Sequence, residues 1–483
     1  MPIEGLKHAC GLYAIYAPGE PVAWMTAQAL DGQQTRGQEG AGVATTDGDN
    51  FHIKKDRGLV IQVFRSPRSV RHLKGFAAIG HNRYSTTGRD KPCNVQPLRV
   101  SGPNGEICLG HNGNLVNALS LREELEADGE TFETTTDSEV VAKLLVREPG
   151  EDWVSRLRGV MRKIEGAYNL TILTKDSVLL ARDRTANRPL SIARMNGSWA
   201  AASESGIFNN QPLEFIRDVH PGEIILLNKD GMSSHVGLTP GPLGLCSFEW
   251  YYFARPDSEI HGVQTYDVRF RAGQTLARSY PADADWVVGV PRSGLYAADG
   301  YSVESGIYQV HGIVANLFYR AFIDPDQEER IRKLEKKYST TNILRDKKVV
   351  IIDDSIVRGN SNERLVRVLR AAKILEAFGV HEIHIRSTYP PIVKPCRFGI
   401  DMATEGELIA ARLGGDKEVV EEKLAQLWGV ASVRYLSLQE AIDAVGLPED
   451  VMCFDCVGGR SAIEIRGEVK KEAFERVPAA VSR

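Results

Sequence analysis

An apolar tetrapeptide that runs directly into two acidic residues constrains the fold of this chain more than any other feature. Val349–Ile352 is followed by Asp353 and Asp354, and then by a small polar loop that reaches Ser361. A continuous apolar run of this length is typical of a strand buried on both faces, as in a parallel sheet. In open α/β sheets, ligands bind at the carboxyl ends of the strands, where this acid pair stands. The second half of the chain is therefore expected to be an α/β domain with a ligand at this loop.

The residue types of the loop suit a sugar pyrophosphate. Adjacent acids can hold ribose hydroxyls, or a Mg²⁺ ion bound to pyrophosphate. Backbone N–H groups and small polar side chains at the start of a helix suit a phosphate. The alternative is a strand followed by a capped helix, but a cap needs only one acid. The predicted ligand-binding residues are Asp353, Asp354, Ser355, Arg358, Gly359, Asn360 and Ser361, with Ser293 as a further pyrophosphate or metal contact.

The two halves of the chain show different patterns. Beyond a Gly/Pro-rich stretch at Gly237–Gly244, apolar strands alternate with helices, which indicates a parallel, doubly wound sheet. Its other expected elements are the strands Trp286–Val290 and Ile383–Ser387 and the helix Glu363–Ala372. Before the stretch, short strands mix with helices and predict an α+β layered domain. The expected strands there are Cys10–Tyr16, Phe76–Gly80, Asn169–Leu173 and Ser177–Arg182, and the expected helices are Pro21–Gly32, Ala118–Ala127 and Asp137–Val146.

Cys10, at the start of the first expected strand, is a candidate nucleophile. If residues 1–9 are removed, Cys10 bears both a thiol and a free α-amine. The α-amine has an ordinary pKa of about 7.7–8.0, so a useful fraction is neutral near pH 7 and can act as the general base for the thiol. The alternative is a buried structural cysteine, which is common in globular proteins.

Glutamine would account for several polar residues elsewhere in the first half. Its α-carboxylate needs an arginine, for which Arg36 and Arg83 are candidates. Its α-ammonium group needs a carboxylate such as Asp137. Thiol attack creates an oxyanion that needs fixed donors, and the Asn112 side chain and the Gly113 N–H, in an expected tight turn, would supply them. Each feature alone has an ordinary alternative as a turn or a helix cap.

Four of the seven cysteines could share one inorganic group. Cys453 and Cys456 form a C-x-x-C pair, and Cys246 and Cys396 lie far from it in sequence. Four thiolates can hold a [4Fe–4S] cluster or a structural zinc ion, and these residues alone do not distinguish the two. A redox pair or a chance spacing also remains open.

Charge and hydropathy exclude some classes of protein. The 59 Lys and Arg residues nearly balance 63 Asp and Glu residues, so there is no electrostatic footprint for nucleic acid. No apolar run approaches the ~18 residues of a membrane span. The first nine residues lack the apolar region of a secretory signal. We therefore expect a cytoplasmic protein, with neither nucleic acid nor a membrane as partner.

Taken together and in order, these motifs resemble the amidophosphoribosyltransferase family, the glutamine phosphoribosylpyrophosphate (PRPP) amidotransferases that open purine synthesis. The resemblance covers nearly the whole chain. Besides Cys10-Gly11 and the acid pair, it rests on Arg36–Gly42, Gly80–Tyr84, His111–Asn117, Glu165–Tyr168, Ser203–Ser205, Phe253–Ser258 and Pro390–Cys396.

The resemblance implies a fold and a reaction. It implies a propeptide (1–9), an Ntn-hydrolase glutaminase domain of four αββα layers (10–240) and an α/β type I phosphoribosyltransferase domain (245–470) that ends in a cluster-binding segment. The reaction would convert PRPP, glutamine and water to 5-phosphoribosylamine, pyrophosphate and glutamate, with purine nucleotides as inhibitors and a homotetramer as the assembly.

The resemblance also implies roles for individual residues. Cys10, Asn112 and Gly113 would be catalytic, and Arg83 and Asp137 would bind glutamine. Mg²⁺ would lie at Ser293, Asp353 and Asp354, and a [4Fe–4S] cluster at Cys246, Cys396, Cys453 and Cys456, leaving Cys93 and Cys108 as structural residues.

Some positions differ from the family pattern. Gly359-Asn360-Ser361 stands where the family usually has Gly-Thr-Thr, and the expected lid loop, Ala315–Arg330, lacks a usual lysine. These differences motivate two alternatives. One is a paralogue that delivers glutamine-derived ammonia to another phosphorylated acceptor, and the other is a weakly catalytic regulator that binds PRPP or nucleotides.

Overall fold

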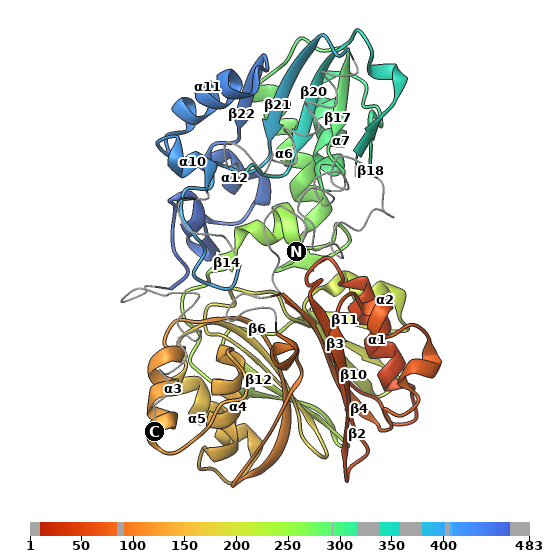
Figure 1. Ribbon diagram of the computed structural model, residues 1–483, viewed down its shortest axis with the longest axis vertical. Coiled ribbons are helices and arrows are strands. Elements are labelled where there is room, and N and C mark those ends of the chain that lie inside the picture. Colours follow the sequence, from red (N-terminus) through yellow and green to blue (C-terminus); the bar gives the residue numbers. More distant parts are fainter. Residues whose placement is uncertain are drawn as a thin grey trace, which may run out of the picture.

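The protein consists of two lobes, each built around its own sheets (Figure 1). The computed structural model describes residues 10–84, 91–291, 293–315, 338–357, 379–400, 406 and 408–463. The first lobe contains two large antiparallel sheets, and the second contains a parallel sheet. The expected helix Glu363–Ala372, residues 1–9 and nearly all of the expected lid loop lie outside the described residues.

The first sheet of the first lobe has seven strands in the order β11-β9-β10-β1-β4-β2-β3. Helix α1 (Val22–Gly32) packs across its outer face. Along β1, Tyr13 and Ile15 pack toward this helix while Ala14 packs into the core between the sheets, as the two-residue period of a strand requires. The strands are β1 (Gly11–Tyr16), β2 (Gly40–Thr46), β3 (Phe51–Arg57), β4 (Ala77–Arg83), β9 (Ser191–Met195), β10 (Ser198–Ala202) and β11 (Glu214–Asp218).

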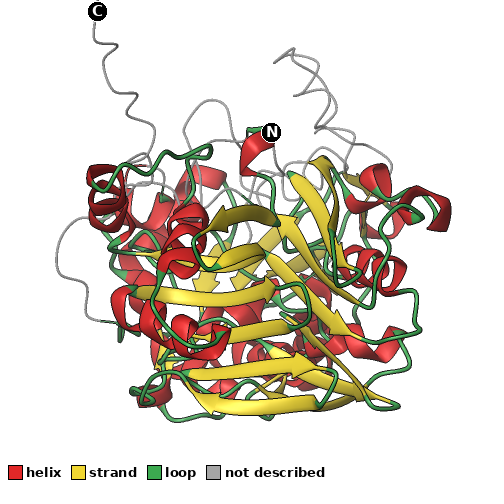
Figure 2. Ribbon diagram, turned by 90° about the horizontal axis from the view of Figure 1, so that it is seen from below, coloured by secondary structure: helices red, strands yellow, loops and turns green. Residues whose placement is uncertain are grey.

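The second sheet has six strands in the order β13-β12-β8-β7-β6-β5. Helices α3 (Ala118–Ala127), α4 (Asp137–Arg147) and α5 (Trp153–Lys163) lie on its outer side (Figure 1). In Figure 2 the molecule is seen from below, with strands in yellow and helices in red. The strands are β5 (Leu98–Gly102), β6 (Gly105–Leu115), β7 (Gly166–Leu173), β8 (Val178–Arg182), β12 (Glu223–Asn228) and β13 (Gly231–Val236).

The two sheets pack face to face through an apolar core. Ile79 of the first sheet and Leu173 and Leu180 of the second are fully buried in this core. Helices cover both outer faces, so the lobe has the four αββα layers that were expected from the sequence.

The second lobe contains four parallel strands in the order β17-β20-β21-β22. Val350 and Ile352 of β20 pack into one core and Val349 and Ile351 into another, so both faces of this strand are covered, as its apolar run predicts. The strands are β17 (Trp286–Gly289), β20 (Lys348–Asp353), β21 (Glu382–Ser387) and β22 (Ser432–Tyr435). The helices are α6 (Thr265–Ser279), α7 (Gly294–Ser305), α10 (Ile409–Arg412), α11 (Lys417–Trp428) and α12 (Leu438–Val445).

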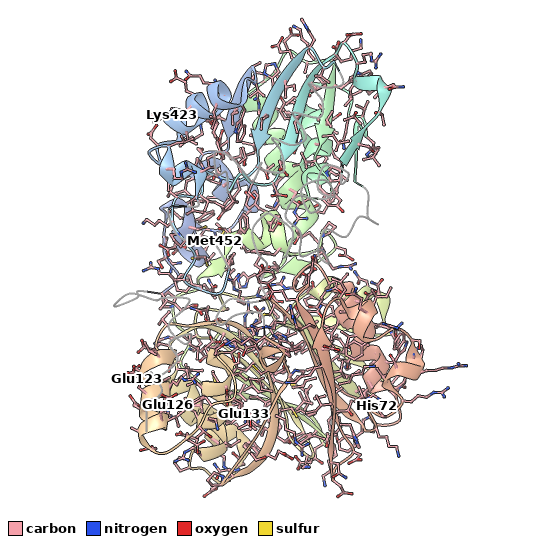
Figure 3. The ribbon with its side chains drawn as sticks, in the orientation of Figure 1. His72, Glu123, Glu126, Glu133, Lys423 and Met452 are labelled. Atoms are coloured by element: carbon pink, nitrogen blue, oxygen red, sulfur yellow. The ribbon has the colours of Figure 1, made fainter. Side chains whose placement is uncertain are left out.

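Short elements form the junction of the lobes. Strand β14 (Leu245–Cys246) pairs in parallel with β23 (Met452–Cys453), which sets Cys246 opposite Cys453. Met452 is fully buried there, whereas Lys423 is on the outside of the second lobe (Figure 3). The remaining elements include α2 (Val60–Val63), β15 (Glu259–Ile260), β16 (Val263–Gln264), β18 (Ile313–Ala315), β19 (Tyr338–Thr340) and the π-helical turn Glu249–Phe253.

One local prediction is wrong. The Asn112-Gly113 pair is not in a tight turn but in the continuous strand β6, where Gly113 pairs with Tyr168 of β7. Gly113 has a φ of 152°, and a Cβ atom there would lie 2.0 Å from the carbonyl oxygen of Ala167. Glycine is needed at this position because the two strands approach too closely for any side chain.

Candidate active sites

The thiol of Cys10 lies against the main chain at the end of β4. Its Sγ is 3.4 Å from the carbonyl oxygen of Tyr84 and 3.5 Å from the Tyr84 nitrogen, which donates to it. Burial raises the pKa of the Cys10 thiol, and Asp137 raises it further, while the Tyr84 backbone and Arg83 act in the opposite direction. The thiol is therefore protonated at neutral pH and needs a base before it can attack a carbonyl.

Arg83 and Asp137 provide a cation and an anion near this thiol. Arg83 ends β4 and donates from Nη1 to the carbonyl oxygen of Asn94 at 2.8 Å. Asp137 begins α4, and its Oδ2 accepts from the Leu115 N–H at 3.1 Å. Burial alone would raise the pKa of Asp137, but the charge and hydrogen bond of His111 and the Leu115 N–H hold it below its usual range. Asp137 is therefore ionised at neutral pH, as a partner for an α-ammonium group must be.

The side-chain amide of Asn112 is buried and has no hydrogen-bond partner among the described residues. Asn112 has no solvent exposure, and neither its Oδ1 nor its Nδ2 makes a hydrogen bond within the described part of the chain. Leaving a buried polar group unsatisfied costs about 1–3 kcal/mol. An amide in this state suits a site that receives a ligand oxygen, which is the function predicted for Asn112.

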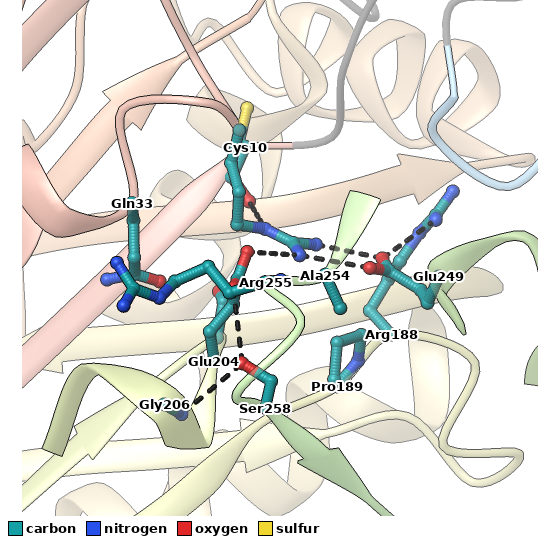
Figure 4. Close-up of polar contacts among 12 residues, drawn as sticks. Cys10, Gln33, Arg188, Pro189, Glu204, Gly206, Glu249, Ala254, Arg255 and Ser258 are labelled. Atoms are coloured by element: carbon teal, nitrogen blue, oxygen red, sulfur yellow. Dashed lines mark hydrogen bonds and ion pairs between the residues drawn. The ribbon is translucent and has the colours of Figure 1, made fainter. Parts of the chain in front are cut away.

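The contacts of Arg36 differ from those expected of a residue that binds glutamine. Its guanidinium is fully buried and donates to Glu204 at 3.1 Å and to Glu249 at 2.8 and 2.9 Å. Figure 4 labels these two glutamates and Cys10. The Nε of Arg36 donates to the carbonyl oxygen of Cys10 at 3.2 Å. Because these contacts engage all three guanidinium nitrogens and leave the group fully buried, Arg36 holds the main chain of Cys10 and is not positioned to bind the carboxylate of a substrate.

A second site lies at the carboxyl end of β20. Asp353 and Asp354 are buried there, and the Ser293 hydroxyl, which follows β17, donates to Oδ2 of Asp354. The Ser355 hydroxyl donates to Oδ1 of Asp354 at 2.8 Å. The structure therefore brings together the residues predicted to hold Mg²⁺, at the edge of the sheet where they were expected. Of the other predicted residues of this site, Arg358, Gly359, Asn360 and Ser361 lie outside the described residues.

Sequence reasoning missed two groups that support the acid pair. The Thr388 N–H donates to the carbonyl oxygen of Asp353 at 3.0 Å. Arg269 of α6 is buried, and burial lowers its pKa to about 10 although the charge of Asp354 acts to raise it. At that pKa, Arg269 remains a cation at neutral pH and offsets part of the negative charge.

The four cysteines predicted to bind a cluster lie near one another. Burial raises the pKa of Cys246 to about 12, and the charges of Cys396 and Cys453 add to this effect. Burial also raises the pKa of Cys456 well above its usual range, with further contributions from the other three thiols. All four are unpaired cysteines. A metal centre binds cysteines as thiolates, and its positive charge would offset the burial that raises these pKa values.

No single-ion site is apparent in the part of the chain that the structure describes, since no three His, Cys, Asp or Glu side chains there are grouped to hold one metal ion. The described helices also include none that is both long and apolar enough to cross a membrane. Of the two remaining cysteines, Cys108 is buried in the core between the sheets and Cys93 is exposed.

Known proteins match the chain over nearly all of its length. Residues 81–210 match the family model of a glutamine amidotransferase domain. The amidophosphoribosyltransferase of Methanocaldococcus jannaschii is 40% identical over 479 residues, which cover 95% of this chain and 98% of that protein. The amidophosphoribosyltransferase of Synechococcus elongatus is 40% identical over 473 residues, which cover 96% of this chain and 93% of that protein.

A solved structure agrees with these relatives. The glutamine PRPP amidotransferase from B. subtilis, complexed with ADP and GMP, superimposes with a TM-score of 0.87 at 34% identity and covers 96% of this chain and 100% of that one. A glutamine amidotransferase domain followed by a phosphoribosyltransferase fold agrees with the two lobes described above. The chain is therefore a member of the amidophosphoribosyltransferase family.

Proposed function

We propose that this chain catalyses the reaction of its family, in which PRPP, glutamine and water give 5-phosphoribosylamine, pyrophosphate and glutamate, the first step of purine synthesis. The observation that supports it most is the coexistence of two sites in one chain. One combines the Cys10 thiol, the Asp137 carboxylate and the Asn112 amide, which has no partner in the described part of the chain, and the other is the acid pair at the end of β20. We assign residues 10–240 to the glutaminase and residues 245–470 to the phosphoribosyltransferase.

In the glutaminase reaction, the thiol of Cys10 attacks the amide carbon of glutamine. Removal of residues 1–9 frees the α-amine of Cys10, which takes the thiol proton and delivers it to the leaving ammonia. The oxyanion accepts hydrogen bonds from Nδ2 of Asn112 and from the Gly113 N–H. Arg83 binds the α-carboxylate of glutamine and Asp137 binds the α-ammonium group. Water then hydrolyses the thioester and releases glutamate.

In the synthase reaction, ammonia attacks C1 of PRPP and pyrophosphate leaves. Asp353, Asp354 and Ser293 would hold the ribose hydroxyls and Mg²⁺, and the ion would supply positive charge against the pyrophosphate. The 5-phosphate is assigned to the residues that follow the acid pair: Ser355, Arg358, Gly359, Asn360 and Ser361. Arg269 is a buried cation near Asp354, and its positive charge offsets part of the negative charge of the acid pair.

We further propose that Cys246, Cys396, Cys453 and Cys456 hold a [4Fe–4S] cluster, which would tie β14 and β23 to the segment before Phe398. All seven cysteines are unpaired, which agrees with a cytoplasmic location. The relative from B. subtilis was solved with ADP and GMP. This supports purine nucleotides as inhibitors here, and we propose a homotetramer as the assembly.

Glutamate release by the purified protein, with and without PRPP, tests the proposed function. We expect PRPP to stimulate turnover and phosphoribosylamine to form in equal amount. Turnover indifferent to PRPP would support a paralogue with another phosphorylated acceptor, and binding without turnover would support a regulator. The intact mass and the visible absorption spectrum of the same sample would show whether residues 1–9 are removed and whether an iron–sulfur chromophore is present.

A further inference from the structure

Four buried charged residues connect the nucleophile to the second lobe. Arg36, Arg188 and Glu204 come from the first lobe, while Glu249 comes from the π-helical turn at the junction. Figure 4 labels Arg188, Glu204 and Glu249. Their side chains are at most 1% exposed. We call these four residues the junction quartet.

One end of the quartet holds the main chain of the nucleophile. Arg36 donates from Nε to the carbonyl oxygen of Cys10 at 3.2 Å, and both of its other nitrogens donate to Glu249. The fork of a guanidinium fixes such a carboxylate in one orientation. The position of the Cys10 main chain therefore depends on a glutamate from outside its own sheet.

The other end of the quartet reaches the strand that presents the oxyanion donors. Arg188 lies 3.4 Å from Glu249 and donates from Nε and Nη2 to the carbonyl oxygen of Phe398, at 3.2 and 2.9 Å. The next residue, Gly399, has a φ of +99°, and a Cβ atom there would lie 2.6 Å from the carbonyl carbon of Gly113.

The neighbouring residues strengthen this contact. The side chain of Asn114 donates to the carbonyl oxygen of Arg397 at 3.0 Å, and Phe398 packs on Ala167 of β7. The segment Arg397–Gly399 of the second lobe therefore presses directly on the strand that contains Asn112 and Gly113.

These contacts form a continuous path from the thiol residue to the oxyanion glycine, and the path passes through the second lobe. We infer that Glu249 and Arg188 are positioning residues for glutamine hydrolysis: through Arg36 and the segment Arg397–Gly399, they fix the spacing between Cys10 and the Asn112-Gly113 donors. Neither residue touches glutamine. The inference rests on the proposed function, because it concerns the rate of that same glutaminase step.

The alternative is a quartet that matters only for the stability of the junction, because removal of one partner from a buried ion pair leaves an uncompensated charge and destabilises the fold. The two roles predict different losses of activity when glutamine or ammonia is the nitrogen source. A stabilising role predicts equal losses with glutamine and with ammonia, whereas a positioning role predicts a loss with glutamine alone. If the donors no longer lie close to the oxyanion, the transition state is less stable and kcat falls. The KM for glutamine changes little, because Arg83 and Asp137 remain in place.

The test compares Glu249→Gln with Glu223→Gln in the full-length enzyme. Glu223 is also buried and also forms a two-bond pair, with Arg217 at 2.7 and 2.8 Å, but it belongs to β12, outside the quartet. For E249Q we expect the glutamine-dependent kcat to fall about tenfold or more, with KM and ammonia-dependent synthesis within about threefold of wild type. For E223Q we expect the ratio of the two activities to be unchanged.

A neutral double variant separates position from charge. E249Q leaves the quartet with an excess of positive charge, and E249Q/R188Q removes one charge of each sign. We expect the double variant to regain thermal stability and to keep the visible absorption of the wild type, without regaining glutamine use.

Two results would overturn the inference: equal loss of both activities in E249Q, or full recovery of glutamine use in the double variant. Wild-type protein that makes phosphoribosylamine from neither nitrogen source would instead contradict the proposed function.

Discussion

At the scale of single residues, Cys10 lies in a different lobe from the acid pair, so the two steps of the proposed reaction can be tested separately. The two hydrogen bonds of the Cys10 thiol among the described residues are with the main chain of Tyr84 in the first lobe, whereas Asp353 and Asp354 lie at the end of a strand in the second. The change Cys10→Ala removes the nucleophile and leaves the acid pair untouched. We expect glutamine-dependent product to fall to background, while synthesis from a high concentration of external ammonium stays within about twofold of wild type. Loss of the ammonia-dependent reaction as well would show that the two sites are not separate.

The pKa of Cys10 leads to a second prediction for the same residue. Because burial raises the pKa of the thiol, the thiolate is scarce at neutral pH and increases as the pH rises. We expect the rate of Cys10 alkylation by iodoacetamide, followed by peptide mass, to keep rising beyond about pH 8.5, the ordinary thiol value. A Cys10 rate that levels off at or below about pH 8.5 would contradict the burial effect.

At the scale of elements, the sequence predicts a structure well where the controlling interactions are local. The strand Val349–Ile352 was recognisable because burial on both faces requires an unbroken apolar run, and the ligand end follows from the chain direction. The Asn112-Gly113 pair was misread because Asn-Gly is common in turns, but pairing with β7 overrides that preference. The site of Arg36 was missed for a related reason: its partners Glu204 and Glu249 are 168 and 213 positions away.

Strand β4 contains a buried histidine that links stability to pH. His81 has no solvent exposure, its Nε2 lies 3.0 Å from the carbonyl oxygen of His111, and burial lowers its pKa to about 3. The unfolded chain binds a proton at this residue below about pH 6.5, whereas the folded chain does not. The contribution of His81 to stability is therefore complete above about pH 6.5 and falls by roughly 1.4 kcal/mol per pH unit as the pH drops toward 3.

The change His81→Gln tests this linkage, because a glutamine can still donate to the carbonyl of His111 but cannot take up a proton in this range. We expect the thermal unfolding midpoint of the variant to fall less steeply than that of wild type between about pH 6.5 and pH 4. His72 is exposed (Figure 3), and His72→Gln should reproduce the wild-type slope. Equal slopes for all three proteins would show that His81 is not the group responsible.

At the scale of the whole molecule, the two proposed sites lie in different lobes, so the proposed reaction requires the nitrogen to travel between them (Figure 1). Ammonia released into bulk water at neutral pH is mostly protonated, and ammonium cannot attack C1 of PRPP. Transfer that excludes water would keep the nitrogen as NH₃. The contacts of Arg397–Gly399 with Gly113 and Asn114 of β6 join the two lobes at the proposed glutaminase end of this route.

A nitrogen-labelling experiment follows from this arrangement. With glutamine labelled with ¹⁵N at the amide and an excess of unlabelled ammonium at neutral pH, we expect the trapped phosphoribosylamine to retain nearly all of the label. Cys10→Ala under the same conditions should give unlabelled product, because only external ammonia can then reach the second site. If the label in the wild-type product is instead diluted in proportion to the added ammonium, the nitrogen passes through the solvent. The two lobes would then be joined for stability rather than for transfer.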